Sequence, residues 1–249
     1  MENIAVLTTT LYRSVNDLRF DLACRMIGSA VGNGYNALIL DESPDSTVPQ
    51  RFLKIGAAVK LGAGRGMPAG RRELFSWAED TNNDFFLWNE PEKDDLNRFI
   101  PEIIAPIVSG VADIVIVGRT EVSWRSCPVL QATSERRANE IYAEVTGLKG
   151  FDPMRGPVAF NRMALPYFAK CDPTKYGSNT GYIQHVAPLE AYIDGLKLAH
   201  VEVDFFYPLA QRAEEEGPLF ETMKVKWPRQ FEECTDVYRR VAKALGLPK

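Results

Sequence analysis

The feature that most constrains the fold of this chain is an alternation of strand-like and helix-like segments through about its first 117 residues. Short apolar and β-branched runs predict buried strands at 4–7, 37–40, 57–61, 85–88 and 113–117. Segments with apolar residues at helical spacing lie between most of these runs. Because parallel strands need a long crossover, usually a helix, the alternation predicts an α/β fold. We expect a mostly parallel, doubly wound sheet with helices on both faces.

Helical periodicity indicates where the connecting helices of the first half lie. Leu18, Leu22 and Met26 form one apolar stripe, for which Ser14 is the expected N-cap. Pro68 is expected to open a second helix, and residues 96–107 a third.

The second half of the chain is less regular, and its elements are predicted one by one. Helices are expected at 134–145 and 188–196 and in a C-terminal amphipathic segment at 231–245, and strands at 158–160 and 198–207. The acidic run at 214–217 is expected to be a mobile, solvated loop.

Charge and cysteine usage exclude several classes of protein. Lys and Arg number 29 against 33 Asp and Glu, so the net charge of −4 argues against a nucleic-acid-binding protein, which needs a basic face. The four cysteines lie far apart and form no CxxC pair, which disfavours a zinc site or a disulfide framework. The sequence shows no signal peptide and no transmembrane segment, so we expect a cytoplasmic protein.

Polar residues follow the predicted strands at the points where the strands end. They occupy 8–12, 41–45, 62–72 and 89–95. Because ligands of doubly wound sheets bind beyond the carboxyl ends of the strands, we expect these four segments to build one site.

The acidic segment at 90–94 is a candidate metal site. Glu90, Glu92 and Asp94 come just after a buried strand, and carboxylate oxygens are the ligands that Mg²⁺ or Mn²⁺ prefers. Such an ion would stabilise a diphosphate leaving group. The alternative is that Asp94 and Asp95 simply begin the next helix, where acidic residues favour the positive end of the dipole.

The glycine-rich loop at 62–66 is a candidate phosphate-binding loop. It matches neither of the usual nucleotide-binding glycine motifs, so a flexible turn is the alternative. Gly64 would let the backbone approach a ligand, and Arg65 and Arg71 could hold phosphate oxygens. Arg71 and Arg72 cannot both face the site from one helix, so one of them is expected at the surface.

His185 follows a polar, glycine-containing segment at 177–181 that could line the same site. Its imidazole is a candidate metal ligand or acceptor-binding group, and an ordinary core histidine is the alternative. No Ser-His-Asp or Cys-His set can be assembled from the sequence.

Six segments, in order along the chain, resemble motifs of family 2 glycosyltransferases such as dolichol-phosphate mannose synthase, which have the GT-A fold. The strand end at 40–45, with Asp41, is similar to that family's D-D-x-S-x-D motif, and 66–72 to its G-x-x-x-A-R motif with Gly70 in place of alanine. The segment at 85–94 is similar to the strand and D-x-D metal motif, here rewritten with Glu90, Pro91 and Glu92.

Three later segments continue the resemblance. Residues 112–119 resemble the A-D-I-V-x-G-S-R motif, 151–160 the acceptor-side D-P-x-S-G-F-R-x-F motif, and 195–207 the G-x-x-I-x-E-V-P-I-x-F strand. The resemblance implies one GT-A domain over 1–210, with a nucleotide-binding half at 1–120 and an acceptor half at 121–210. Residues 211–249 would add the loop and the C-terminal helix.

The resemblance also implies a function, which is transfer of a sugar from a nucleotide-diphosphate sugar, GDP-mannose-like or UDP-linked, to a phosphate or hydroxyl acceptor. The acceptor could be a small molecule or a lipid phosphate, and Mg²⁺ or Mn²⁺ would assist. The implied nucleotide-binding residues are Thr8, Thr9, Tyr12, Asp41, Gly64, Arg65 and Arg71, and the implied metal-binding residues are Glu90, Glu92, Asp94 and His185. Arg71 and Arg212 would stabilise the leaving group, and Glu92 and Arg155 complete the catalytic set.

Departures from the family pattern leave other functions open. Glutamates replace both aspartates of the metal motif, which keeps a catalytically silent domain that binds a nucleotide sugar or a partner protein as an alternative. A sugar-1-phosphate nucleotidyltransferase is a second one. Arg155 replaces a small residue, so the acceptor is expected to carry negative charge or to differ from the family's. The aromatic C-terminal third could pack a core, shield the acceptor or form a homodimer.

Overall fold

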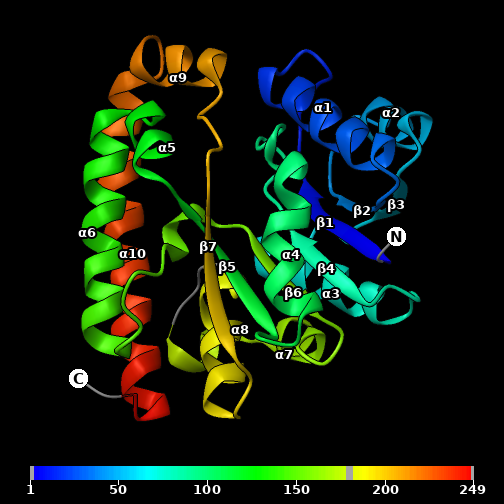
Figure 1. Ribbon diagram of the computed structural model, residues 1–249. Helices are drawn as coiled ribbons and strands as arrows, with labels where there is room; N and C mark the ends of the chain where they lie inside the picture. The colour runs from blue at the N-terminus through cyan, green and yellow to red at the C-terminus, as the bar shows by residue number, and fades with distance from the viewer. Residues whose placement is uncertain (1–2, 178–181, 248–249) are drawn as a thin grey trace.

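The computed structural model describes residues 3–177 and 182–247 as one α/β molecule (Figure 1). Its strands are β1 (Ile4–Thr10), β2 (Asn36–Asp41), β3 (Ala58–Leu61), β4 (Phe85–Trp88), β5 (Ile114–Arg119), β6 (Val158–Asn161) and β7 (Leu198–Val203). Its helices are α1 (Leu18–Gly32), α2 (Thr47–Ile55), α3 (Met67–Glu79), α4 (Ile100–Val108), α5 (Glu121–Ser126), α6 (Val129–Thr146), α7 (Leu165–Lys170), α8 (Ile183–Ile193), α9 (Leu209–Glu216) and α10 (Phe220–Leu245). Short 3-10 turns are η1 (Leu96–Phe99), η2 (Pro153–Arg155) and η3 (Pro173–Tyr176).

The strands form one sheet in the order β3-β2-β1-β4-β6-β5-β7. All neighbouring strands run parallel except at β6, which is antiparallel to both β4 and β5. The predicted mostly parallel, doubly wound sheet is therefore confirmed. Because β1, β2, β3 and β4 are parallel, their carboxyl ends lie along the same edge of the sheet.

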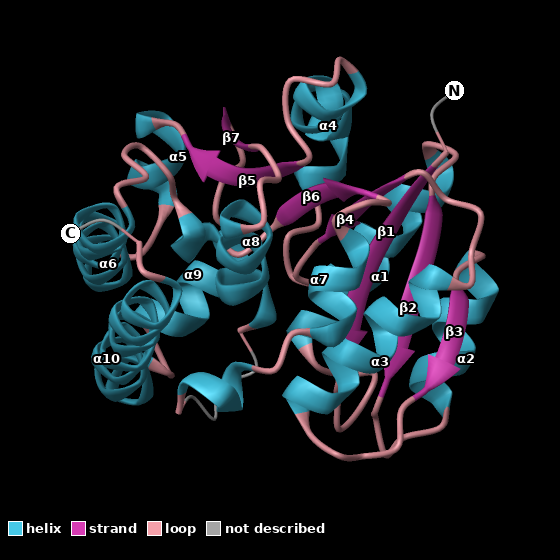
Figure 2. Ribbon diagram, turned by 90° about the horizontal axis from the view of Figure 1, so that it is seen from below, coloured by secondary structure: helices cyan, strands magenta, loops and turns pink. Residues whose placement is uncertain are grey.

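Helices cover both faces of the sheet, as predicted (Figure 2). On one face, α3, α7, α8 and α10 bury an aromatic-rich core in which Phe75 contacts Trp88 and Phe168, and Phe160 stacks on Phe168. On the other face, α1, α2 and α4 bury a mainly aliphatic core. Alternation of side chains along each strand supplies both cores, since successive residues point to opposite faces.

The C-terminal helix α10 packs along α6 as a parallel pair at the side of the sheet beyond β7 (Figure 1). Trp227, Cys234 and Tyr238 are buried on α10, and Tyr238 contacts Tyr142 of α6 edge to face at 5.1 Å. Phe231 and Tyr238 therefore pack a core, which is one of the roles that the sequence left open for the C-terminal aromatic residues.

The structure corrects several sequence predictions. Asp17, not Ser14, caps α1, since its carboxylate accepts from the amide of Arg19. The acidic run at 214–216 belongs to helix α9, and its middle residue Glu215 is 2% exposed, so this stretch is not a solvated loop. The helix expected at 188–196 begins at 183 and the strand expected at 198–207 ends at 203. Helices α2, α5, α7 and α9 were not predicted.

Among the described residues, no helix is long and apolar enough to cross a membrane.

Candidate functional site

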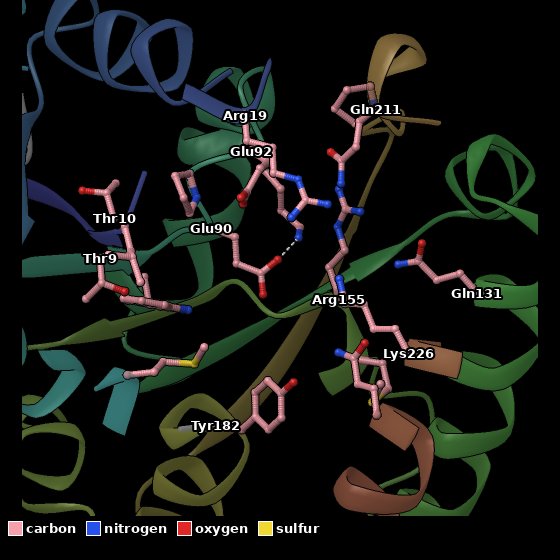
Figure 3. Close-up of a pocket in the computed structure, with 18 of the residues that line it drawn as sticks. Thr9, Thr10, Arg19, Glu90, Glu92, Gln131, Arg155, Tyr182, Gln211 and Lys226 are labelled. Atoms are coloured by element: carbon pink, nitrogen blue, oxygen red, sulfur yellow. Dashed lines mark hydrogen bonds and ion pairs between the residues drawn. The ribbon is translucent and has the colours of Figure 1, made fainter. Parts of the chain in front are cut away.

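A pocket of about 440 Å³ opens at the carboxyl edge of the sheet, where the sequence predicted a site. One wall comes from the segments after β1, β2, β3 and β4, and contains Thr9, Thr10, Tyr12, Glu42, Arg71, Trp88, Glu90, Glu92 and Lys93. The opposite wall comes from the acceptor half and the C-terminal helices, and contains Gln131, Arg155, Gln211, Lys226, Trp227 and Gln230. The pocket lies between the two halves of the chain, and Figure 3 shows side chains of both walls facing one space.

The predicted nucleotide-binding residues separate into two groups. Thr9 and Tyr12 line the pocket, but Asp41 does not. The Asp41 carboxylate is 1% exposed and accepts from the hydroxyls of Thr10 and Ser43, both at 2.7 Å. The Ser43 hydroxyl in turn accepts from the backbone amide of Tyr12 at 2.8 Å. Asp41 therefore positions the β1 and β2 ends, while its neighbour Glu42 faces the pocket.

Three other residues of the predicted nucleotide set lie away from the pocket. Thr8 is fully buried within the sheet. Gly64 has a left-handed φ of +66° but open space around it, and Arg65 forms an exposed ion pair with Glu73 at 3.2 Å. The glycine-rich loop therefore contributes its end, Gly66, rather than Gly64 or Arg65, to the lining.

The turn after β4 presents two carboxylates and a lysine to the pocket. Glu90 forms an ion pair with Lys93, and Glu92 lies beside it. Burial acts to raise the pKa of Glu90, but the charges of Lys93, Arg71 and Arg155 together hold it below its ordinary value. Burial, followed by the charge of Glu90, raises the pKa of Glu92. The two glutamates are therefore chemically distinct.

Gly156 explains how Glu90 fits so closely against the acceptor segment. Its φ of +98° is one that side-chain-bearing residues rarely adopt, and a Cβ there would lie 2.5 Å from Oε1 of Glu90. The glycine of the acceptor-side motif thus leaves the space that the Glu90 carboxylate occupies.

The predicted four-residue metal set is not assembled. No group of three or more His, Cys, Asp or Glu side chains among the described residues could hold a metal ion. Glu90 and Glu92 line the pocket, but Asp94 is turned outward and bonds Arg25 of α1 at 2.8 Å. Asp94 was included in the predicted set because it follows the same strand as the two glutamates. Its side chain instead points away from the pocket, toward α1.

His185 is also separate from the carboxylates. Its ring stacks between Tyr182 and Tyr238, and its Nδ1 lies 2.9 Å from the Tyr238 hydroxyl. Tyr182, not His185, lines the pocket. The histidine is therefore a core residue behind the pocket wall, which is the alternative that the sequence left open. Residues 178–181 of the segment expected to line the site lie outside the described residues.

The burial of His185 predicts a specific pH dependence of stability. Burial, and then the positive charge of Arg71, lower the pKa of His185 to about 4. The unfolded chain binds this proton near pH 6.5, so the native state loses about 1.4 kcal/mol per pH unit as the pH falls from 6.5 to 4. Urea unfolding between pH 4 and 7.5 measures this slope. His185→Asn should flatten it, and an equal slope in the variant would contradict the assignment.

Arg71 is a buried cation in the pocket lining. It is 7% exposed, lies over the Trp88 ring at 4.7 Å, and donates to Oε1 of Gln184 at 2.8 Å. Its neighbour Arg72 pairs with Asp172 nearer the surface, as expected for consecutive helical residues. Arg71 is thus placed where the sequence predicted an anion-binding arginine.

Arg155 occupies the middle of the pocket, between Glu90 on one side and Gln131 and Lys226 on the other (Figure 3). It is 4% exposed, and its guanidinium lies over the Phe205 ring at 4.2 Å. Its Nε and Nη2 have no hydrogen-bond partner within the described part of the chain. Burial, and then the charge of Arg119, lower its pKa to about 10. A buried guanidinium with two free donors is a binding group for an anion.

A second buried arginine, Arg119, is fully paired, and its charge acts on Arg155. Arg119, at the end of β5, donates from Nε and Nη2 to the two carboxylate oxygens of Asp152, both at 2.8 Å. It also bonds Glu135 of α6. Asn139 donates to Asp152 at 2.6 Å. This network joins two of the segments that carried the sequence resemblance, 112–119 and 151–160.

Arg212, the other predicted leaving-group arginine, is not in the pocket. It bonds Glu216 at 2.9 Å and the carbonyl of Ser126 at 3.1 Å. Its neighbour Gln211 lines the pocket instead. The pocket-lining side chains Gln131, Lys226 and Gln230 were not predicted, because nothing local in a sequence distinguishes a pocket-facing polar residue on a helix from a solvated one.

One end of the pocket is closed by contacts between α1 and α9. Arg19 pairs with Glu215 at 3.3 Å. Glu215 also accepts from the Tyr207 hydroxyl at 2.6 Å and from Gln211 at 3.1 Å. The first and last thirds of the chain therefore meet over the pocket.

Buried polar atoms without partners are concentrated around this pocket. Within residues 3–177 and 182–247 they include, on its lining, Tyr12 Oη, Glu42 Oε1, Trp88 Nε1 and Gln131 Oε1, in addition to Arg155. Native proteins leave few such atoms unsatisfied, so their clustering indicates a polar ligand.

Comparison with solved structures identifies the fold. A crystal structure of glucosyl-3-phosphoglycerate synthase from Mycobacterium tuberculosis with phosphoglyceric acid matches with a TM-score of 0.63 and 14% identity, over 100% of this chain and 81% of that chain. The same enzyme with Mn²⁺, UDP-glucose and phosphoglyceric acid matches with a TM-score of 0.57 and 16% identity, over 100% and 81%. A structure described as a mycobacterial protein matches with a TM-score of 0.60 and 16% identity, over 100% and 76%.

The chain has a GT-A fold. The sequence itself matches no protein-family model and no curated protein. The GT-A fold predicted from the ordered motifs is confirmed, and the narrower likeness to dolichol-phosphate mannose synthase stays a prediction from those motifs.

Proposed function

We propose that this protein transfers a sugar from a nucleoside-diphosphate sugar to a small anionic acceptor. The observation that carries the proposal is Arg155, a buried guanidinium in the pocket at the carboxyl edge of a GT-A sheet, two of whose donors have no partner among the described residues. The similar solved enzyme was crystallised with UDP-glucose and phosphoglyceric acid, which supports UDP-glucose as the first donor to test and a phosphorylated acid as the first acceptor.

The donor fits the wall built by the N-terminal half. Thr9, Tyr12 and Glu42 surround the place for the nucleoside, and Arg71 and the turn at 90–93 the place for the diphosphate. The Glu42 carboxylate packs against Gly62, where a Cβ would lie 2.6 Å from its Cγ. It presents an acceptor oxygen for a hydroxyl or ring N–H of the nucleoside.

Of the four residues predicted to bind a metal, Glu90 and Glu92 are the two through which Mg²⁺ or Mn²⁺ fits this wall. Two carboxylates on one turn, facing the same pocket, supply hard oxygen ligands, and a donor diphosphate would complete the coordination. When bound, the ion would neutralise the leaving diphosphate. The similar solved enzyme has Mn²⁺ in its UDP-glucose complex, which supports this assignment.

The acceptor fits the opposite wall. Arg155 and Lys226 provide positive charge, and Gln131, Gln211 and Gln230 provide amides that bond hydroxyl or carboxylate groups. This polar lining favours a water-soluble acceptor over a lipid phosphate, and Arg155 would fix its anionic group beside the donor. Homodimer formation remains a prediction from the sequence.

Ligand-induced thermal stabilisation tests the proposal. UDP, GDP, ADP and their common sugar conjugates are each titrated into the protein with and without Mn²⁺. The donor that stabilises the protein is then incubated with the protein and phosphoglyceric acid, and transfer of the sugar is measured. We expect one nucleotide, at a concentration of 100 times its Kd, to raise the melting temperature by several degrees. Binding at that concentration adds about 2.7 kcal/mol to the free energy of unfolding. Glu92→Gln should reduce the additional stabilisation by the nucleotide that depends on Mn²⁺.

Two outcomes would redirect the assignment. Selective donor binding without turnover over a panel of phosphorylated and carboxylated acceptors would favour the catalytically silent domain. No stabilisation by any nucleotide at millimolar concentration would contradict donor binding altogether.

A further inference from the structure

Lys93 is held in the donor wall by bonds on both its backbone and its side chain. Its amide donates to the carbonyl of Glu90 at 3.0 Å, and its ammonium pairs with the Glu90 carboxylate. Its carbonyl accepts from Asn89 at 3.3 Å. Its side chain is 15% exposed, which is low for a lysine, so the ammonium is fixed within the pocket rather than extended into solvent.

Positive charge exceeds negative charge around Glu90. Besides Lys93, the charges of Arg71 and Arg155 act on this carboxylate. Glu92 adds a second carboxylate at the turn. A divalent cation that binds Glu90 must displace the lysine and approach two guanidinium groups. A diphosphate, in contrast, is attracted by all three cations.

We propose that Lys93 is a donor-binding residue that holds the diphosphate directly and competes with a divalent ion for Glu90. The inference rests on the proposed function, because it assigns a role within the same donor site. It makes nucleotide-sugar binding partly independent of metal, with side-chain cations supplying charge that an ion otherwise supplies.

Replacing Lys93 should have different effects on donor binding and on metal binding if the lysine competes with the ion, but not if its role is only structural. Replacing the ammonium removes an attraction for the diphosphate, so donor binding without metal weakens. The same replacement frees Glu90, so metal binding without donor strengthens. A lysine that merely stiffens the turn would weaken both.

Calorimetric titration of Lys93→Met tests this directly. UDP-glucose and GDP-mannose are each titrated into the whole protein in EDTA and in Mn²⁺, and Mn²⁺ is titrated alone. In EDTA we expect the donor that binds the natural protein to lose at least about tenfold in affinity, the usual size of one charge-assisted contact. We expect Mn²⁺ alone to bind several-fold more tightly, and Lys93→Arg to keep the metal-free donor binding.

Lys54→Met is the matched control, because Lys54 lies exposed on α2, away from the pocket. It should change neither the affinity for the donor in EDTA nor the affinity for Mn²⁺ alone. Loss of all donor binding by the natural protein in EDTA, or unchanged metal-free binding by Lys93→Met, would overturn the role of Lys93 while leaving the proposed function in place. Failure of both nucleotide sugars to bind even with Mn²⁺ would overturn this inference, and failure of the whole nucleotide panel would overturn the proposed function with it.

Discussion

Arg155→Met is expected to lower kcat/KM for an anionic acceptor by about 100-fold without lowering the stability of the protein. The activity loss follows from the two free donors of the guanidinium, since a charge-assisted pair of bonds to a bound anion contributes about 3 kcal/mol. The free energy of unfolding of the variant should lie within about 0.5 kcal/mol of that of the natural protein, or above it. Arg155 has no carboxylate partner in the part of the chain that the structure describes, so removing its buried charge relieves a desolvation cost, and methionine retains contact with Phe205.

The measurement combines urea unfolding, donor titration and turnover of UDP-glucose with phosphoglyceric acid. Arg212→Met is the control, because that arginine bonds Glu216 on α9 and lies outside the pocket. It should leave turnover unchanged. An Arg155→Met protein that is strongly destabilised but fully active would show that the guanidinium serves the fold, and would contradict its assignment to the acceptor.

Asp152→Ala should give the largest loss of stability, about 3–5 kcal/mol. The variant leaves Arg119 buried with Nε and Nη2 unbonded, and it removes the acceptor for Asn139. Breaking one side of a buried ion pair costs far more than the pair itself contributes, because the remaining charge stays desolvated. Urea unfolding at pH 7 measures the difference.

The control for this variant is Asp236→Ala on α10. Asp236 pairs with Arg240 at 2.8 Å, but both side chains are about half exposed, so its loss should cost less than about 1 kcal/mol. Equal unfolding midpoints for the two variants would contradict the role of the Arg119 network.

Much of the architecture could be predicted because it depends on local patterns. The apolar runs at 4–7 and 85–88 are too short for helices and too apolar for the surface, so they predict buried strands, and both lie at the centre of the sheet. Strand β6 illustrates the limit of this reasoning. Its sequence predicts a strand, but not that it runs antiparallel between β4 and β5.

The site was predicted in outline and not in detail. Polar segments after parallel strands must meet at one edge, and those after β1, β2, β3 and β4 do line the pocket. Neighbouring polar residues could not be distinguished, however. Glu42 faces the pocket while Asp41 is turned inward, because the hydroxyls of Thr10 and Ser43 satisfy the aspartate there.

The sequence by itself determined the periodicity of the elements, the parallel sheet and the edge at which polar groups gather. Only the tertiary structure decided which charges are neutralised and which remain free to bind a ligand. Arg119 meets Asp152 from 33 residues away, and Arg19 meets Glu215 from 196 residues away. Arg155 has no such carboxylate partner among the described residues. The strength of a charge depends on its burial and on the groups brought next to it, and packing of distant segments sets both.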